Sequence, residues 1–201
     1  MTKRKRQVVV IGGGETFDFY KDYLRFFSRL KFDPYEKRAS NWKDSLQKDL
    51  GNKYYEVIKL SMPNPLNAQY EEWKIQFRKL LPYLRDNVIL LGHSLGALFL
   101  VKYLSENRFL LKIKGLLLVA CPHGGLLSNL NDFVLEADLR RLRNLKIPIH
   151  FFHSMDDQVV RYYEGKDLAH TTKATLHSFK KRGHFIFDKH FPEVVEVIKS
   201  L

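Results

Sequence analysis

The feature that most constrains this chain is a glycine-bracketed serine between two apolar segments. The motif GHSLG occupies residues 92–96, directly after the apolar run 88–91 and directly before the apolar run 97–101. The first run is typical of a buried strand, and the second is typical of a buried helix. The serine therefore lies at a tight strand-to-helix turn, where a glycine at each end lets the two elements approach closely.

This position allows two interpretations of Ser94. In the first, the turn is a nucleophile elbow, which exposes the hydroxyl at the amino end of a helix, where the helix dipole favours developing negative charge. In the second, Ser94 belongs to a glycine-rich loop and only caps the helix. The strand before it, the helix after it and the acidic and histidine residues downstream favour the nucleophile.

Composition favours one α/β domain over residues 1–201, because 45% of the residues are hydrophobic and supply a sizeable core. The chain has 34 Lys and Arg against 22 Asp and Glu, which gives a formal net charge of +12. Basic clusters lie at 3–6, 140–143 and 180–182 and raise the question of an anionic partner. No long basic helix or complete nucleic-acid motif accompanies them, so a solvated surface is favoured over nucleic-acid binding.

Cysteine usage and hydropathy predict a cytoplasmic protein. Cys121 is the only cysteine, so no intrachain disulfide is expected. The apolar run 8–11 stops at the glycines 12–14, too early for a secretory signal. No apolar stretch reaches the length of a membrane span.

Apolar runs and helical periodicity alternate along the chain. Strands are predicted at 8–11, 54–60, 88–91, 114–120, 149–153 and 174–179. Helices are predicted at 19–30, 41–50, 67–81, 97–104, 162–170 and 192–201. This alternation predicts a mainly parallel, doubly wound sheet in a three-layer α/β/α sandwich. Residues 122–146 have a mixed pattern and form either a small lid or an ordinary connecting helix.

A serine nucleophile needs a base, and the base needs an acceptor that orients it. In the serine, acid, histidine order of α/β hydrolases, the acid follows a strand. Asp156 and Asp157 follow the predicted strand 149–153. Asp157 is favoured because an acid before x-Val-Val matches the usual hydrolase pattern, whereas Asp156 suits the turn itself. An Asx-turn pair without a catalytic role is the alternative for both.

His184 is the predicted base, because it follows the last strand and comes directly after Gly183, which lets the loop bend. A structural histidine is the alternative interpretation. His190 is the competitor, but it stands at the start of the last helix and is interpreted as a surface or capping residue. His93, inside the motif, is interpreted as packed beside the nucleophile without a chemical role.

Two backbone amides are needed to hold the oxyanion of a tetrahedral intermediate. Leu95 supplies the first. Gly13 is predicted to supply the second from the glycine loop 12–14, with Gly14 as the next choice. A dinucleotide site is the rival interpretation of this loop, but Phe17 stands where its third glycine is needed.

No cofactor or metal is predicted. His150 and His153 are three positions apart on one strand, which turns them to opposite faces. Residues 182–187 faintly resemble an RNA-binding string, but the second aromatic strand of that module is not evident.

Together these motifs resemble the α/β-hydrolase superfamily. The likeness is to the group of small serine hydrolases that includes the retinoblastoma-binding protein nine hydrolase and bacterial relatives. The matching segments are 54–58, 62–65, 70–73, 92–96, 156–157 and 183–185, so the resemblance covers most of the chain from Trp42 onward. It implies the α/β-hydrolase fold, a triad of Ser94, Asp157 and His184, a cytoplasmic setting and no cofactor.

The front of the chain departs from that group, because residues 16–38 are longer and more aromatic than its usual loop. Phe19, Tyr23, Phe26 and Phe27 are hypothesised to form an apolar wall near the acyl site. Packing into the core is the alternative, and it is favoured for most of them.

The sequence therefore predicts a serine hydrolase that cleaves an ester, thioester or activated amide through an acyl-enzyme on Ser94. The alternative is a non-catalytic binding protein on a hydrolase scaffold that uses its basic surface. The natural substrate, transfer to an acceptor other than water, and the oligomeric state stay open.

Overall fold

A single parallel sheet organises the chain. The structure, a computed structural model, describes residues 4–36, 39–124, 130–135 and 138–201. Its strands lie side by side in the order β2-β1-β3-β4-β5-β6, and every neighbouring pair is parallel. Their bounds are β1 Arg6–Ile11, β2 Tyr55–Leu60, β3 Val88–His93, β4 Ile113–Val119, β5 Ile149–Ser154 and β6 Thr175–Phe179. Because the order turns outward in both directions from β1 and β3, the sheet is doubly wound, as predicted.

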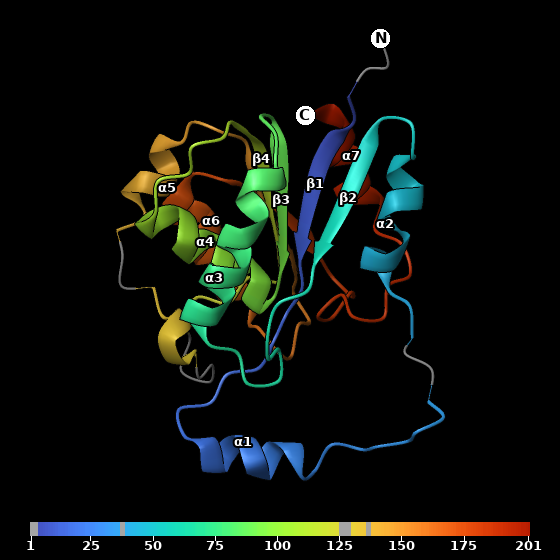
Figure 1. The fold of residues 1–201 in the computed structure, drawn as a ribbon, viewed down its shortest axis with the longest axis vertical. Helices are drawn as coiled ribbons and strands as arrows, with labels where there is room; N and C mark the ends of the chain where they lie inside the picture. The colour runs from blue at the N-terminus through green and yellow to red at the C-terminus, as the bar shows by residue number, and fades with distance from the viewer. Residues whose placement is uncertain (1–3, 37–38, 125–129, 136–137) are drawn as a thin grey trace.

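Helices cover both faces of this sheet (Figure 1). One face carries α2 Trp42–Leu50 and α7 Pro192–Ser200. The other carries α3 Tyr70–Leu80, α4 Leu95–Glu106, α5 Arg140–Asn144 and α6 Tyr162–Thr172, with the short helices η1 Leu81–Tyr83 and η2 Asn131–Phe133. The three-layer α/β/α sandwich is therefore confirmed. No helix among the described residues is long and apolar enough to cross a membrane.

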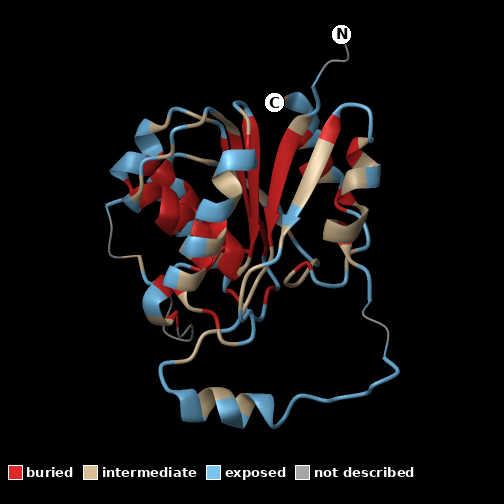
Figure 2. Ribbon diagram, viewed as in Figure 1, coloured by how far each residue is buried: buried red, intermediate tan, exposed pale blue. Residues whose placement is uncertain are grey.

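The hydrophobic core is divided by the sheet into two layers (Figure 2). Strands β1 and β3 are apolar on both faces because helices cover both, which is typical of parallel sheets. Trp73, Phe77 and Phe99 fill the layer under α3 and α4, and Trp42 fills the layer under α2. Full burial of a large apolar side chain contributes about 1.5–3 kcal/mol, so these residues stabilise the packing of the helices on the sheet.

Helix boundaries follow local signals. Asn41 caps α2 with a full capping box. Its side-chain oxygen accepts from the backbone amide of Lys43, and its backbone amide donates to the carboxylate of Asp44. Gly51 ends the same helix at a φ of 89°. The helix predicted at 67–81 is observed as α3, which ends at Leu80. Pro82 lies in the next short helix, η1, because proline is tolerated in the first turn of a helix.

The segment predicted as a lid or connecting helix, residues 122–146, holds η2 and α5. Phe133 and Leu142 from these helices are buried in the core. Residues 125–129 and 136–137 of this segment lie outside the described residues. Whether the segment acts as a lid stays a prediction.

Helix α1, Tyr20–Phe27, departs from the favoured expectation of core packing. None of its residues is buried, and Figure 1 shows it beyond the carboxyl ends of the strands, set apart from the sandwich. Helical periodicity correctly predicted the element, because its aromatic residues do share one side. The expectation that this side packs into the core was wrong.

Candidate functional site

Ser94 lies at the carboxyl end of β3, at the sharp turn into α4. Its backbone has φ 56° and ψ −127°, a conformation that costs a residue with a Cβ about 1–3 kcal/mol. The turn is held by the Ser94 amide, which donates to the Val119 carbonyl at 2.8 Å, and by the Ser94 carbonyl, which accepts from the Ala97 amide at 2.9 Å. The strain indicates a functional constraint on this residue.

Two glycines make the turn sterically possible. A Cβ on Gly92 would overlap the backbone of Ala97, and a Cβ on Gly96 would overlap the carbonyl oxygens of Ile11 and Gly12. Helix α4 therefore packs directly against the end of β1 and against β3. The motif glycines are explained by these backbone contacts, as the sequence predicted.

The glycine loop after β1 lies against Ser94. A Cβ on Gly13 would stand 3.0 Å from the Ser94 Cβ and 3.4 Å from its Oγ, so Gly13 faces the hydroxyl. Gly14 instead faces the Pro65 carbonyl and the Trp73 ring. As the first residue of α4, Leu95 has no acceptor for its amide within the helix. The structure thus brings Gly13 against Ser94, whose next residue in the chain is Leu95.

Asp157 lies in the loop after β5, with a side chain that is 0% exposed. Its Oδ1 accepts from the amides of Val159 and Val160 at 2.8 and 2.9 Å, and its Oδ2 accepts from His184 Nδ1 at 2.8 Å. Burial raises the pKa of this carboxyl, but the hydrogen bond and charge of His184 and the two amides outweigh burial and lower it. Asp157 is therefore ionised at neutral pH and oriented toward His184.

Asp156 has a different role, in the turn itself. It accepts from the Ser154 hydroxyl and from the Gly183 amide, the latter at 3.0 Å. These bonds tie the loop after β5 to the loop that carries His184. Between the two adjacent acids, only Asp157 contacts the imidazole in the described structure.

Replacing Asp157 with asparagine is expected to lower the free energy of unfolding by about 1–3 kcal/mol at pH 7. Asparagine has a single acceptor oxygen, so it cannot accept both from the Val159 and Val160 amides and from His184 Nδ1. The pKa of Asp157 is lowered in the folded state, so its contribution is present above the unfolded-state value and is lost as pH falls through the folded-state value. Urea unfolding at pH 7 and at about pH 3 measures this. The difference in free energy of unfolding between wild type and D157N should be smaller at about pH 3 than at pH 7. D167N, at an exposed position of α6, should have the wild-type free energy of unfolding at both pH values.

His184 is held by its neighbours in the chain and in space. Phe185, directly after it, is fully buried in the layer under α2 and α7, where its ring stacks on Phe191 with centroids 5.1 Å apart. Trp42 donates to the Phe185 carbonyl at 2.9 Å. These contacts fix the backbone on the carboxyl side of His184. Its imidazole is 8% exposed and points to Asp157.

His93 has a positioning role that the sequence analysis missed. Its Nε2 donates to the His184 carbonyl at 2.9 Å, and its Nδ1 lies 3.4 Å from the Lys43 ammonium. Burial chiefly, and the charges of Lys43 and His184, lower the pKa of His93 well below its usual value, so the ring is neutral. The rings of His93 and His184 lie 5.0 Å apart, which connects the residue before Ser94 to the predicted base.

Glu15, next to the glycine loop, is a second residue that the sequence analysis missed. Desolvation raises the pKa of its carboxyl, while the charge of His184 acts in the opposite direction. Its amide donates to the Pro65 carbonyl and its carbonyl accepts from the Ala68 amide, both at 2.8 Å. These bonds fasten the glycine loop to the segment before α3. Sequence spacing gave no sign of them, because the partners lie in a separate loop.

His153 packs beside Asp157, and Gly165 packs against His153. His153 is fully buried, and its Nε2 lies 3.0 Å from the Val160 carbonyl and 3.7 Å from Asp157 Oδ2. Burial lowers the pKa of His153, so it packs as a neutral ring that donates to Val160. A Cβ on Gly165 of α6 would overlap the His153 ring, which explains the glycine there.

Other candidate chemistries find little support. The described residues contain no group of three or more His, Cys, Asp or Glu side chains arranged to hold a metal ion. Cys121 is buried, and burial raises the pKa of its thiol well above the usual value, so it is a weak nucleophile. Residues 182–187, which resemble an RNA-binding string, form turns and bends and not the strand that this module requires. His190 is exposed and pairs with Asp49 on α2.

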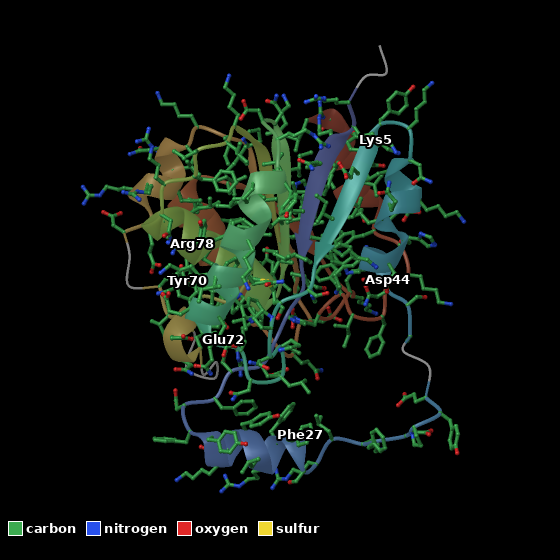
Figure 3. The ribbon with its side chains drawn as sticks, in the orientation of Figure 1. Lys5, Phe27, Asp44, Tyr70, Glu72 and Arg78 are labelled. Carbon is green, nitrogen blue, oxygen red and sulfur yellow. The ribbon has the colours of Figure 1, made fainter. Side chains whose placement is uncertain are left out.

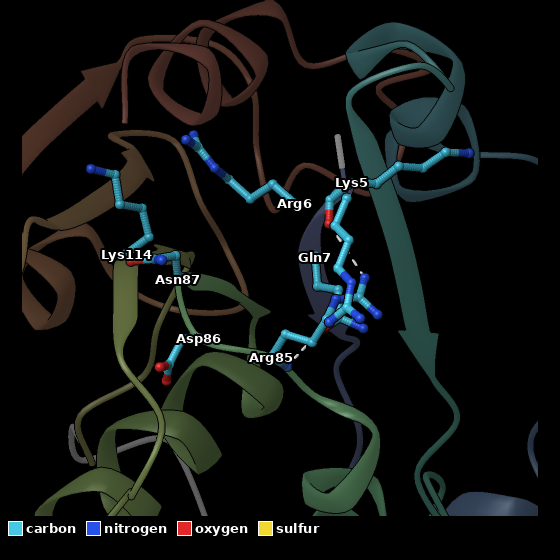
Figure 4. Close-up of a pocket in the computed structure, with 8 residues that line it drawn as sticks. Lys5, Arg6, Gln7, Arg85, Asp86, Asn87 and Lys114 are labelled. Carbon is cyan, nitrogen blue, oxygen red and sulfur yellow. Dashed lines mark hydrogen bonds between the residues drawn. The ribbon is translucent and has the colours of Figure 1, made fainter. Parts of the chain in front are cut away.

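Basic residues gather at the opposite edge of the sheet (Figure 4). A pocket of about 550 Å³ is lined there by Arg6, Arg85 and Lys114, among others, at the amino ends of β1, β3 and β4. Arg85 is partly neutralised by Glu56 at 2.5 Å. A binding role for this surface would therefore operate far from Ser94, which lies at the carboxyl end of β3.

Comparison with known proteins identifies the family. The serine hydrolase family profile matches residues 35–201, most of the chain. This chain belongs to the serine hydrolase family. The serine hydrolase is 29% identical over 169 residues to YdeN of Bacillus subtilis strain 168, whose name assigns it to the hydrolases. That alignment covers 81% of this chain and 88% of YdeN.

Solved structures agree on the fold. The crystal structure of the B. subtilis ydeN product superposes on this serine hydrolase with a TM-score of 0.78 at 25% identity, covering 98% of both chains. A YdeN-like hydrolase from Pectobacterium atrosepticum gives 0.67 at 17% identity, covering 98% and 90%. An esterase domain from Rhodothermus marinus superposes with a TM-score of 0.63 at 15% identity, covering 97% of this chain and 84% of that domain. At identities this low, the last two likenesses show the fold alone. The serine hydrolase thus has the compact α/β-hydrolase fold that its sequence predicts.

Proposed function

We propose that this hydrolase cleaves an ester, thioester or activated amide through an acyl-enzyme on Ser94. The observation that carries the proposal is the hydrogen bond of 2.8 Å between His184 Nδ1 and the buried Asp157, at the same sheet edge as the strained Ser94. A buried carboxylate fixes the tautomer of an imidazole and stabilises its protonated form. That pairing is what a histidine needs to act as a general base.

The proposed reaction has two halves. The Ser94 Oγ attacks the substrate carbonyl carbon while its proton passes to His184 Nε2, and the amides of Leu95 and Gly13 hold the oxyanion. The bond to the leaving group then breaks, and the leaving group takes the proton from His184. Water next attacks the acyl carbon, with His184 again as base, and releases the acid and free Ser94. The chemistry requires no metal or organic cofactor.

The proposed closeness to the retinoblastoma-binding protein nine group rests on the motifs quoted above. A cytoplasmic location is proposed from cysteine usage, hydropathy and that resemblance. The competing proposal, a binding protein that uses its basic edge, differs in one respect. It does not require an activated serine, whereas the hydrolase does.

The deciding experiment is treatment with a fluorophosphonate followed by peptide mapping. We expect the adduct on Ser94 and hydrolysis of p-nitrophenyl acetate by the same protein. Gly13→Ala should lower kcat/KM by about tenfold or more, because the new Cβ would stand 3.4 Å from the Ser94 Oγ, where the substrate carbonyl must lie. Gly12→Ala is the matched control, since its Cβ meets nothing within 4 Å. An unlabelled Ser94 in folded protein would reject the hydrolase, and salt-sensitive retention of that protein on nucleic acid would favour the binding protein.

A further inference from the structure

Helix α1 has an apolar side that the sandwich does not cover. On a helical wheel, Tyr20, Tyr23, Phe26 and Phe27 fall on one arc, and Lys21 and Arg25 fall on the other. Tyr20 is 67% exposed and Phe27 is 51% exposed, although apolar rings of this size are normally covered. Contacts with the core therefore contribute little to the stability of this helix. The four aromatic side chains, here called the aromatic arc, are available to a ligand.

The aromatic arc faces the rest of the molecule. Tyr20 and Tyr23 line a pocket of about 560 Å³ together with the residues before and at the start of α3, among them Asn64, Pro65 and Leu66. Figure 3 shows Phe27 on the same inner side of α1. A pocket of this volume is within the usual range for small-molecule sites. An extended surface such as a membrane does not fit a side that is turned inward, whereas a single chain does.

Ring contacts give this arc a defined shape. Phe17, in the loop before α1, lies 5.2 Å from Phe26 and 5.9 Å from Tyr23, centroid to centroid, and Tyr23 lies 5.7 Å from Phe27. The Phe17 carbonyl accepts from the Asn131 side chain at 3.0 Å, which fastens the loop to η2. The aromatic residues therefore form one connected apolar wall, fastened to the sandwich before α1.

The glycine loop 12–14 lies between this pocket and Ser94. Pro65, which lines the pocket, accepts from the Glu15 amide at 2.8 Å and would touch a Cβ on Gly14. Gly13, one residue further, faces the Ser94 Oγ. One short loop thus separates the proposed oxyanion position from the aromatic arc.

The position of the pocket also indicates which half of the substrate it receives. The loop of His184 packs on the α2 and α7 side of the sheet, through Trp42 and Phe185. The pocket lies on the α3 side, where Pro65 and Gly14 meet Trp73. A leaving group must lie near His184 to receive its proton, so the acyl group extends the other way, toward α1.

We propose that the aromatic arc of α1 and the 64–69 segment form an acyl-chain subsite, so that the substrates are esters or thioesters of apolar, unbranched acids. This inference rests on the proposed function and specifies its substrate class. Each methylene that enters the subsite should raise kcat/KM by about fourfold. The preference should vanish when the arc is removed, while the reaction at Ser94 continues.

The first test compares hydrolysis of p-nitrophenyl acetate and octanoate. Octanoate has about six methylenes more than acetate, and two of them in the subsite already supply a preference of about tenfold or more in wild type. The double variant Tyr23→Ala with Phe27→Ala should lose this preference while keeping acetate turnover. Neither side chain is buried, so the variant should unfold at the wild-type temperature. Tyr83→Ala, which removes a ring that is 74% exposed at the other end of the sheet, should retain the preference. Equal octanoate preference in wild type and the double variant would overturn the subsite.

The second test distinguishes the acyl half from the alcohol half. Ethyl octanoate and octyl acetate carry the same long chain on opposite sides of the ester, and the proposal requires that α1 variants affect only ethyl octanoate. A loss confined to octyl acetate would place the leaving group on α1 and reject the assignment.

The third test uses adducts and needs no turnover. A phosphonate with an octyl group on phosphorus should slow hydrogen exchange in residues 17–30, whereas one with a methyl group should not, since only the octyl group reaches α1. Equal exchange in both adducts overturns the subsite alone. Absence of an adduct on Ser94 with either reagent overturns the proposed function and the subsite with it. Protection that follows protein concentration and not the alkyl group would identify a second copy as the occupant and reject the acyl chain.

Discussion

Replacing Ser94 with glycine is expected to abolish turnover and to make the protein more stable. Loss of the hydroxyl removes the nucleophile, which should lower kcat by about 10⁴-fold or more. Ser94 holds a φ of 56°, which costs about 1–3 kcal/mol with a Cβ and nothing with glycine. Glycine also adds about 0.5–1 kcal/mol of unfolded-state entropy, so the net gain should be about 1 kcal/mol.

Thermal unfolding and ester hydrolysis measure both effects on the same preparation. A gain of about 1 kcal/mol should raise the melting temperature by about 2–4 °C in a chain of this size. Ser94→Ala is the control, since it removes the hydroxyl but keeps the Cβ at the same φ. It should be inactive without being stabilised. A glycine variant less stable than the alanine variant would show that the turn stores no strain.

Replacing Gly96 with alanine is expected to disrupt the turn itself. The new Cβ would overlap the carbonyl oxygens of Ile11 and Gly12, which are backbone atoms and cannot rotate away. Helix α4 would have to move away from the end of β1, at a cost of about 3 kcal/mol or more. Ser94 moves with α4, and Gly13 moves with β1, so phosphonate labelling should fall together with stability.

Gly12→Ala provides the comparison, because its Cβ meets open space although Gly12 contributes to the same contact. It should lie within about 0.5 kcal/mol of wild type in urea unfolding. If Gly96→Ala proved as stable as Gly12→Ala, the close approach of α4 and β1 would not be needed for the turn.

The sequence predicted the sheet because its central strands β1 and β3 are apolar on both faces. Runs such as Val8–Ile11 and Val88–Leu91 leave no polar side for solvent, and only a covered parallel sheet accommodates several of them. The neighbourhood of Ser94 was predictable for a related reason. Parallel strands end at one edge, so residues that follow different strands meet there, and His184 does contact Asp157.

The roles of His93, Glu15 and α1 could not be predicted, because they depend on contacts between segments far apart in the chain. No local sequence pattern encodes such contacts. The hydrogen bond from His93 to the His184 carbonyl joins residues 91 positions apart. Glu15 comes near His184 because the loop after β1 folds over Ser94. Periodicity showed that the aromatic residues of α1 share a side, but not whether this side meets a core, a ligand or solvent.

The isolation of α1 has a consequence for how such a protein can diversify. Helix α1 adds no buried residue to either core layer, so substitutions within this helix leave the folding of the sandwich largely untouched. Natural variation or engineering could therefore replace α1 with a different helix between the same two flanking loops. Such a replacement would change the substrate selectivity while the stability of the sandwich stays the same.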